Sequence, residues 1–155
     1  MRQSLSENPV SMSRPATRQR GSGASALWAA FVLSAVLAAA AIADQAAIHA
    51  LRDYSTDMYA RYDVPANSGA LYAILYTAAV VGALSWLPAV IGAHKGRRWA
   101  PAAATVAAVI AAGLALLMFT TAEYGEMLFP PVWGVLALLP ALAGVLGVVL
   151  LFRRK

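Results

Sequence analysis

The chain has 155 residues, of which 61% are hydrophobic and only 12% are charged, with a formal net charge of +5. A soluble domain averages about 25% charged residues, so this chain has too few charges to cover a water-exposed surface. It has no cysteine, which excludes disulfides, thiolate metal sites and cysteine nucleophiles. The positive charge is divided among three short segments and forms no basic stripe with interleaved aromatic residues, so no nucleic-acid partner is expected.

Residues 1–23 are polar and basic, and we expect them to form a disordered cytoplasmic tail. Beyond the tail, four long segments lack Asp, Glu, Lys and Arg, and each is long enough for a helix that crosses the hydrocarbon core. The sequence therefore predicts an all-α fold, an integral membrane bundle of four antiparallel transmembrane helices within residues 24–152. The predicted spans are 25–43, 69–93, 99–122 and 130–152, with an outer loop at 44–68 and a basic cytoplasmic end at 153–155.

The first span allows a second interpretation. Ala41-Ile42-Ala43 resembles a signal-peptidase site, and cleavage after Ala43 would leave three spans in the same orientation. A cleavable apolar region usually has about 7–15 residues, which is shorter than this segment, so a retained span is the preferred interpretation. The intact mass of the purified protein distinguishes the two.

The segments that connect the spans alternate in charge. The tail carries +3, residues 44–63 carry −2, residues 94–98 carry +3, the loop around Glu123 carries −2, and the C-terminal end carries +3. Basic residues favour the cytoplasmic side, so both termini are predicted to be cytoplasmic. The same basic inner loop has a second interpretation, contact with anionic lipid head groups, although a topology signal is simpler. The topology-determining residues are Arg18, Arg20, Lys95, Arg97, Arg98, Arg153, Arg154 and Lys155.

The outer segment after the first span has the pattern of an amphipathic helix, either lying on the membrane or continuing the span. Asp57 and Arg61 are spaced to form an ion pair on that helix. The stretch from Val64 to Gly69 contains a proline and a glycine and is predicted to end it. One predicted face carries Ala47, Leu51, Tyr54, Met58 and Tyr62, and another carries Gln45, His49, Asp53 and Asp57.

Three residues of the polar face, His49, Asp53 and Asp57, are candidate metal ligands because side chains four apart on a helix converge. One histidine with two carboxylates and no second motif is a weak pattern, and a solvated polar face is the preferred interpretation. No metal or other cofactor is therefore expected. The sequence shows no nucleophile–base set and no phosphate-binding loop, so we do not expect an enzyme.

The predicted spans contain no ionisable residue, whereas transporters usually retain some. Their serine and threonine hydroxyls are expected to bond back to their own helix. Tyr72 and Tyr76 share a face near the outer side and are candidates for ligand or partner contact, although an aromatic belt is the simpler interpretation. Small residues recur every four positions, which predicts close helix packing, at Ala30-Ser34-Ala38, Ala104-Ala108-Ala112 and Ala143-Gly147.

A further set of residues comprises Leu71-Tyr72, Tyr76-Thr77, Trp86, Trp99, Leu128-Phe129-Pro130-Pro131 and Leu138 to Gly144. With these residues the chain resembles small, uncharacterised four-span membrane proteins of high-GC actinobacteria, over about Trp28 to Phe152. The resemblance implies a bacterial inner membrane and transfers no functional residues. We therefore expect a non-catalytic accessory, scaffold or sensor subunit, with the lipid bilayer and another membrane protein or itself as partners. A small oligomeric transporter or channel is the alternative.

Overall fold

The computed structural model describes residues 20–153, and over that range the protein consists of helices, one short hairpin and the segments that connect them. The predicted tail falls mostly on residues 1–19, which lie outside the described residues, as do Arg18, Arg154 and Lys155. The elements are α1 (Arg20–Ala43), the π-helical turn η2 (Asp44–Ile48), α2 (Ala50–Ala60), α3 (Ser68–His94), α4 (Ala100–Thr120), β1 (Ala122–Glu123), β2 (Glu126–Met127) and α5 (Pro131–Phe152).

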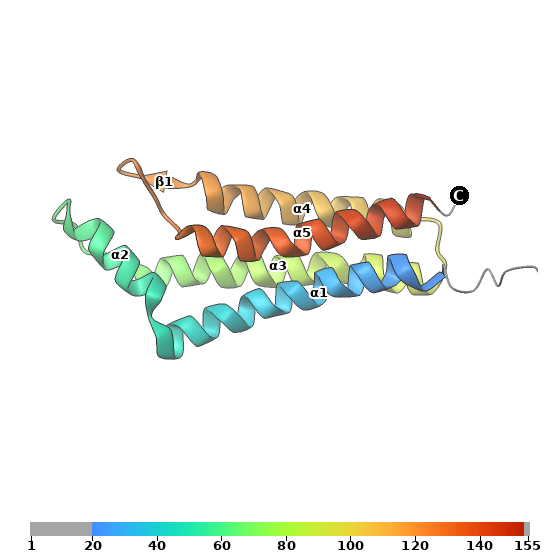
Figure 1. Ribbon diagram of the computed structural model, residues 1–155, viewed down its shortest axis with the longest axis horizontal. Coiled ribbons are helices and arrows are strands. Elements are labelled where there is room, and N and C mark those ends of the chain that lie inside the picture. The colour runs from blue at the N-terminus through green and yellow to red at the C-terminus, as the bar shows by residue number, and fades with distance from the viewer. Residues whose placement is uncertain (1–19, 154–155) are drawn as a thin grey trace, which may run out of the picture.

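Within the described residues, four helices are long and apolar enough to cross a membrane: α1 continued through η2, α3, α4 and α5. Around the bundle, α1 packs beside α3 and α5, and α4 packs beside the same two helices. Figure 1 shows the four lying side by side along the long axis, with α2 and β1 at one end. The four predicted apolar helices are confirmed, although α1 begins at Arg20 rather than at Ser25.

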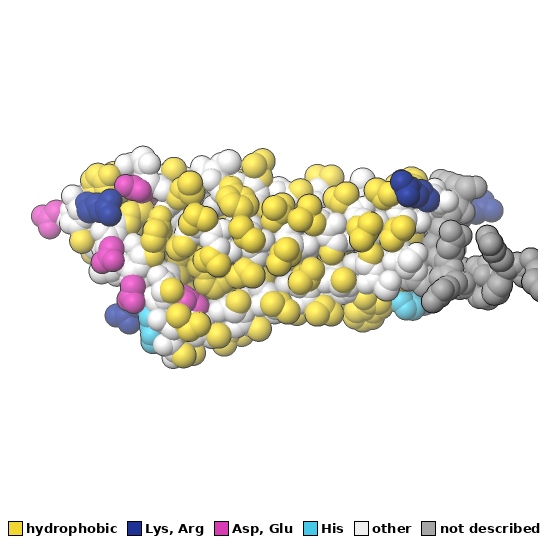
Figure 2. All heavy atoms as spheres, viewed as in Figure 1, with side chains coloured by type: hydrophobic (Ala, Val, Ile, Leu, Met, Phe, Trp, Pro, Cys, Tyr) yellow, Lys and Arg dark blue, Asp and Glu magenta, His cyan; other side chains and the backbone are white. Residues whose placement is uncertain are grey.

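The outer surface of the bundle is apolar over most of its length. Figure 2 shows hydrophobic side chains covering the middle of the visible face, with acidic side chains gathered at the end that carries α2. Val109, near the middle of α4, is 66% exposed, and Leu116, about one turn before the end of α4, is 62% exposed. Monomeric soluble proteins rarely expose contiguous apolar patches of more than a few hundred Å². A continuous apolar surface of this kind is suited to lipid.

Small residues line the interior of the bundle, because helix backbones in an apolar environment associate through close packing. Ala30 and Ser34 of α1 are buried as predicted, and so are Ala104 and Ala108 of α4. Ala112 faces outward, so the predicted packing at this residue does not occur within the bundle of this chain. At 3.6 residues per turn, a strict four-residue step drifts off the buried face. The buried alanines of α4 are Ala100, Ala104, Ala107, Ala108, Ala111 and Ala115.

Glycines let large side chains enter the bundle at three places. A Cβ atom on Gly144 of α5 would lie 1.9 Å from Cη2 of Trp86, which reaches across from α3. A Cβ atom on Gly134 would lie 2.8 Å from the ring of Phe119, and one on Gly147 would lie 2.8 Å from Leu27. These distances are shorter than van der Waals contact, so at these positions the packing requires glycine.

The predicted outer helix forms, but it is separate from α1. His49 has φ 62°, in the left-handed region, and separates η2 from α2. The prediction of one continuous face is therefore wrong for Ala47, which is exposed on η2. The buried face of α2 is instead Leu51, Ser55 and Met58. The helix ends as predicted before α3, where the Asn67 side chain accepts a hydrogen bond of 3.1 Å from the Ala70 N–H.

Candidate functional site

One end of the bundle is covered by a polar assembly that we call the cap, comprising residues 44–63 and 121–128. It contains η2, α2 and the hairpin formed by β1 and β2, in which Glu123 pairs with Glu126. Leu51 and Met58 of α2 join the core cluster at this end of the bundle, which also contains Phe129. The cap is thus anchored by apolar packing from below while its upper surface is polar.

Asp44 holds the corner at which α1 turns into α2. Its side chain is only 3% exposed. The N–H of Ala50 donates to its Oδ1 over 3.0 Å, and the N–H of Leu51 donates to its Oδ2 over 3.1 Å. These are the first two residues of α2, and the adjacent His49 supplies no side-chain cap. A carboxylate is favoured at a helix N-terminus because the unpaired N–H groups and the helix dipole attract negative charge.

The backbone of the same aspartate closes the π-helical turn. Its carbonyl oxygen accepts a hydrogen bond of 2.7 Å from the N–H of His49, five residues later. Helical turns of this kind are rare. This one is attached to α3, because the Tyr72 hydroxyl donates to Asp44 Oδ2 over 2.6 Å. The sequence placed Asp44 at the start of the outer loop, and the structure shows that it is buried there.

The two tyrosines predicted as contact residues are both engaged inside the protein. Tyr72 is 4% exposed and its hydroxyl is bonded to Asp44. Tyr76, one turn further along α3, is half-buried and donates a hydrogen bond to the Gln45 side-chain oxygen of η2. The structure therefore gives both residues a role in attaching the turn η2 to α3.

Three tyrosines of the α2 segment fasten it to the hairpin. The Tyr54 hydroxyl donates to the Met127 carbonyl oxygen over 2.7 Å, and the Tyr62 hydroxyl donates to the Tyr124 carbonyl oxygen over 2.9 Å. The Tyr62 and Tyr124 rings are stacked, with centroids 4.6 Å apart. The Tyr59 hydroxyl donates to the Glu123 carboxylate. We call Tyr54, Tyr59 and Tyr62 the tyrosine clasp.

Hydrogen bonding to Glu123 changes the acidity of Tyr59. The bond, assisted by partial burial and the nearby carboxylate charge, raises the pKa of the Tyr59 hydroxyl to about 12. Deprotonation would put a phenolate against a carboxylate, so the neutral phenol is favoured. Tyr59 therefore remains a hydrogen-bond donor throughout the physiological pH range.

The ion pair at the cap joins different residues from those predicted. Arg61 Nη1 lies 3.2 Å from Glu126 Oε1 on the hairpin, so the predicted pair of Arg61 with Asp57 is wrong. Both partners are largely exposed, and an exposed pair contributes little to stability. The ion pair adds a fourth contact between the α2 segment and the hairpin, beside the three hydrogen bonds of the tyrosine clasp.

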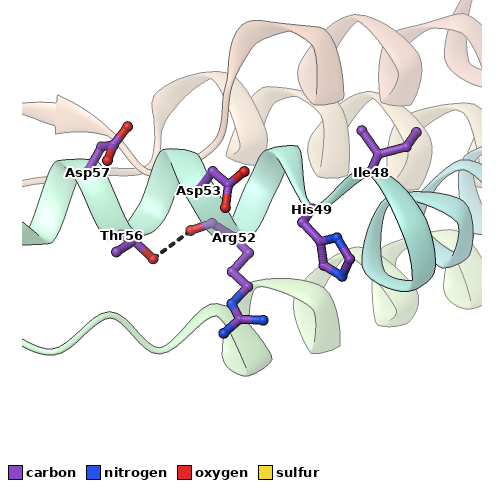
Figure 3. Close-up of a pocket in the computed structure, with 6 residues that line it drawn as sticks. All are labelled: Ile48, His49, Arg52, Asp53, Thr56 and Asp57. Atoms are coloured by element: carbon purple, nitrogen blue, oxygen red, sulfur yellow. Dashed lines mark hydrogen bonds between the residues drawn. The ribbon is translucent and has the colours of Figure 1, made fainter.

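The three candidate metal ligands lie along a hollow on the free side of α2, and Figure 3 shows their directions. Asp53 and Asp57 point to one side of the helix, whereas His49 and Arg52 point to the other. His49 lies at the break before α2, so the four-residue spacing does not bring its ring beside Asp53. Among the described residues, no group of three or more His, Cys, Asp or Glu side chains is placed to hold a metal ion.

The serine and threonine hydroxyls of the predicted spans bond to carbonyl oxygens of their own helices, as predicted. Ser34 donates to the Ala30 carbonyl oxygen over 3.0 Å, and Thr77 donates to the Ala73 carbonyl oxygen over 2.8 Å. A cavity of about 20 Å³ lies beside Ser34 near the middle of the bundle, with Pro140 of α5 also in its wall. This volume holds about one water molecule. The same back-bonding is present at Ser85, Thr105, Thr120 and Thr121.

The end of the bundle opposite the cap carries the described topology-determining residues. Lys95, Arg97 and Arg98 form the turn between α3 and α4, and Arg153 follows α5. Arg20 opens α1 at the same end. The structure thus gathers the three predicted basic segments, as far as they are described, at one end.

The sequence analysis missed Asp44 and the tyrosine clasp. A tyrosine-rich helix facing a short acidic loop was visible in the sequence, but nothing in it paired individual residues across about 60 positions. The hairpin had a weak signal, because a two-residue turn with glycine at the second position is typical of β-hairpins.

No protein-family model matches this chain, and neither a curated protein nor a solved structure matches it.

Proposed function

We propose that this protein is a multi-pass membrane protein of a bacterial plasma membrane that acts as a non-catalytic accessory, scaffold or sensor subunit. Its four apolar helices would cross the bilayer in antiparallel order, with both termini in the cytoplasm and the cap outside. The observation that carries the proposal is the tyrosine clasp. It fastens α2 to the hairpin and leaves Arg52, Asp53 and Asp57 exposed.

Membrane insertion is supported by the length and apolar character of the four helices and by their outward-facing valines and leucines. The orientation is supported by the charge difference between the two ends of the bundle. The end with Lys95, Arg97 and Arg98 is basic, and basic residues are retained on the cytoplasmic side. The cap segments carry an excess of acidic residues, which do not oppose translocation.

The orientation can be tested directly because the chain contains no cysteine. Single-cysteine variants Asp57→Cys and Lys95→Cys are expressed in intact cells and treated with a membrane-impermeant maleimide. We expect labelling at position 57 in intact cells, and at position 95 only after the membrane is permeabilised. The opposite pattern would refute the proposed topology.

A role in transport by a single chain receives little support from the interior. The cavity beside Ser34 holds about one water molecule, and the Ser34 hydroxyl donates its hydrogen bond to its own helix. A transport path needs polar groups that face a continuous cavity. The buried carboxylate, Asp44, is saturated by hydrogen bonds to Ala50, Leu51 and Tyr72.

The expected partner is the extracytoplasmic loop or domain of another membrane protein, bound through the exposed side of α2. A rigid helix that is held from behind loses little conformational entropy on binding, which favours recognition. Asp53 and Asp57 point to the same side of α2, away from Arg52, so the partner surface should carry basic groups facing the two carboxylates.

Photocrosslinking tests this role. A photoreactive amino acid is placed at Thr56, on the exposed side of α2, and in a control chain at Val109, which faces outward in mid-bundle. The proposal predicts one stoichiometric adduct from position 56, lost in the Asp53→Lys/Asp57→Lys variant and absent from position 109. Adducts of the protein only with itself would reject the accessory role and favour an oligomeric channel or transporter.

A further inference from the structure

A groove of about 410 Å³ lies at the basic end of the bundle, between the turn that joins α3 to α4 and the last turns of α5. One part of its lining is polar and comes from Gly96, Arg97 and Arg98. The other part is apolar and includes Pro101 of α4 and the buried Leu151 of α5. The groove therefore combines two arginine residues with a hydrocarbon wall.

The backbone of the turn is fixed by its own hydrogen bonds. The N–H of Arg97 donates to the Gly92 carbonyl oxygen over 2.9 Å, and the N–H of Gly96 donates to the Ala93 carbonyl oxygen over 3.3 Å. Gly96 has φ 61°, so these bonds form the helix-ending Schellman motif, in which glycine adopts the left-handed conformation. The stems of Arg97 and Arg98 consequently start from defined positions.

Packing beneath the turn also fixes its position. A Cβ atom on Gly92 would lie 2.9 Å from the Trp99 ring, so the indole lies directly against the α3 backbone. The N–H of Ala100 then donates to the Arg97 carbonyl oxygen over 3.1 Å, and α4 begins. The N-terminus of α4 adds the positive end of a helix dipole beside the groove.

Among the described residues, no carboxylate forms an ion pair with Arg97 or Arg98. The ion pair found among the described residues joins Arg61 to Glu126, at the opposite end of the bundle. Arg97 and Arg98 are both exposed and adjacent in the chain. Guanidinium groups bind phosphate oxygens through paired hydrogen bonds, which makes a phosphate-bearing anion the best-matched ligand.

The apolar wall of the groove distinguishes between a free phosphate ion and the phosphate group of a lipid. A free phosphate ion gains nothing from Pro101 and Leu151. A phospholipid presents a phosphodiester next to glycerol and acyl carbons, which matches cations beside an apolar surface at the end of a membrane-spanning bundle. The groove lies at the ends of α3, α4 and α5, at the level where head groups meet hydrocarbon if these helices span the bilayer.

We propose that this groove binds the head group of an anionic phospholipid, with Arg97 and Arg98 on the phosphate and the wall at Leu151 against the first acyl carbons. The assignment rests on the membrane residence proposed above. It is independent of the partner of α2, and a reversed topology would change only the leaflet from which the lipid comes.

Native mass spectrometry of the detergent-solubilised full chain tests the assignment, with phosphatidylglycerol, phosphatidylcholine and inorganic phosphate as separate probes. We expect one retained phosphatidylglycerol and weaker retention of phosphatidylcholine. The Arg97→Ala/Arg98→Ala variant should bind phosphatidylglycerol roughly 30-fold more weakly. The matched control is Lys95→Ala, which removes a charge from the same turn outside the groove and should change binding less than about threefold.

Three results would overturn the proposal. Equal retention of the two lipids by the wild-type protein would show that the groove does not select anionic head groups. An equal loss of phosphatidylglycerol binding in Lys95→Ala would show that the turn attracts lipid only through its overall positive charge. Competition by inorganic phosphate at the lipid's own concentration would show a simple anion site. Circular dichroism of each variant checks folding, and crosslinking at Thr56, which these variants should leave unchanged, reports separately on the proposed function.

Discussion

The hydroxyl of Tyr72 donates a hydrogen bond of 2.6 Å to Oδ2 of Asp44, and this bond joins α3 to the turn that ends α1. The same carboxylate accepts the first two N–H groups of α2. One buried side chain therefore sets the direction in which the chain leaves the bundle and the point at which α2 starts.

Replacing Tyr72 by phenylalanine should destabilise the protein by about 1.5–3 kcal/mol, because a buried hydrogen bond to a charged group is lost. Asp44→Ala should cost more, since Ala50, Leu51 and Tyr72 would all lose their acceptor. Reversible unfolding in mixed micelles measures both losses. The control is Tyr76→Phe, which removes a half-exposed bond to the neutral Gln45 and should cost about 0.5–1.5 kcal/mol. Equal losses for the two tyrosine variants would contradict the central role of Asp44.

Gly144→Ala should destabilise the bundle by about 1–3 kcal/mol or more, because the added methyl group collides with the Trp86 ring. Gly113→Ala is the matched control. Gly113 has open space around it, so alanine there should be neutral or stabilising by up to about 1 kcal/mol. Thermal unfolding in detergent compares the two variants.

Trimming the indole should rescue the Gly144→Ala variant. The Trp86→Leu/Gly144→Ala double variant should be more stable than the sum of the single losses implies, because the two positions are in contact. Trp86 Nε1 is buried without a hydrogen-bond partner among the described residues, so removing the indole leaves no acceptor unpaired. If the losses in unfolding free energy of the two single variants simply add, the methyl group on residue 144 is accommodated by residues other than Trp86.

The attachment of α2 to the hairpin should weaken at high pH. The pKa of Tyr59 is about 12 in the folded protein and about 10 in an unfolded chain. A raised folded-state pKa means that the bond stabilises the cap fully below about pH 10 and loses that effect as pH rises towards 12. The difference in absorbance at 295 nm between wild type and Tyr59→Phe follows this one hydroxyl.

Glu123→Gln provides the test of the cause. The hydrogen bond to Glu123 is the largest contribution to the raised pKa of Tyr59, so removing the charge should move the titration to lower pH. Glu126→Gln leaves the Tyr59 partner in place and should change the titration little. A titration that stays near pH 12 in Glu123→Gln would assign the shift to burial instead.

The hairpin turn should depend on Gly125. Tyr124 and Gly125 have φ of 55° and 83°, the two positive values that a two-residue hairpin of type I′ requires. Gly125→Ala meets no neighbouring atom within 4 Å, so its cost is backbone strain alone, about 1–2 kcal/mol. Hydrogen exchange at the Leu128 amide, which donates to the Thr121 carbonyl oxygen, should accelerate while amides in mid-α4 keep their protection. An unchanged exchange rate at the Leu128 amide would contradict the expected backbone strain at position 125.

The sequence was sufficient for the four apolar helices, because a segment without charges that is long enough to cross hydrocarbon has few other stable states. Hydroxyl back-bonding inside the spans also followed from local chemistry, as Ser34 and Thr77 illustrate. The end of the outer helix before Asn67 was predictable for the same reason, since proline and an Asn cap act over a few residues. These features are local, so they could be derived from the chain alone.

The tertiary structure decided the features that depend on contacts between distant residues. The clasp joins Tyr54, Tyr59 and Tyr62 to hairpin residues 73, 64 and 62 positions away. In the sequence, Asp44 is one charged residue of a loop. In the structure, the turn at His49 places its carboxylate at the N-terminus of α2 and beside Tyr72. Arg61 forms its ion pair with Glu126 and not with Asp57, because the hairpin lies beside the end of α2. A side chain's partner is set by which backbones the packed core brings together, and residue spacing along one helix carries no information about that.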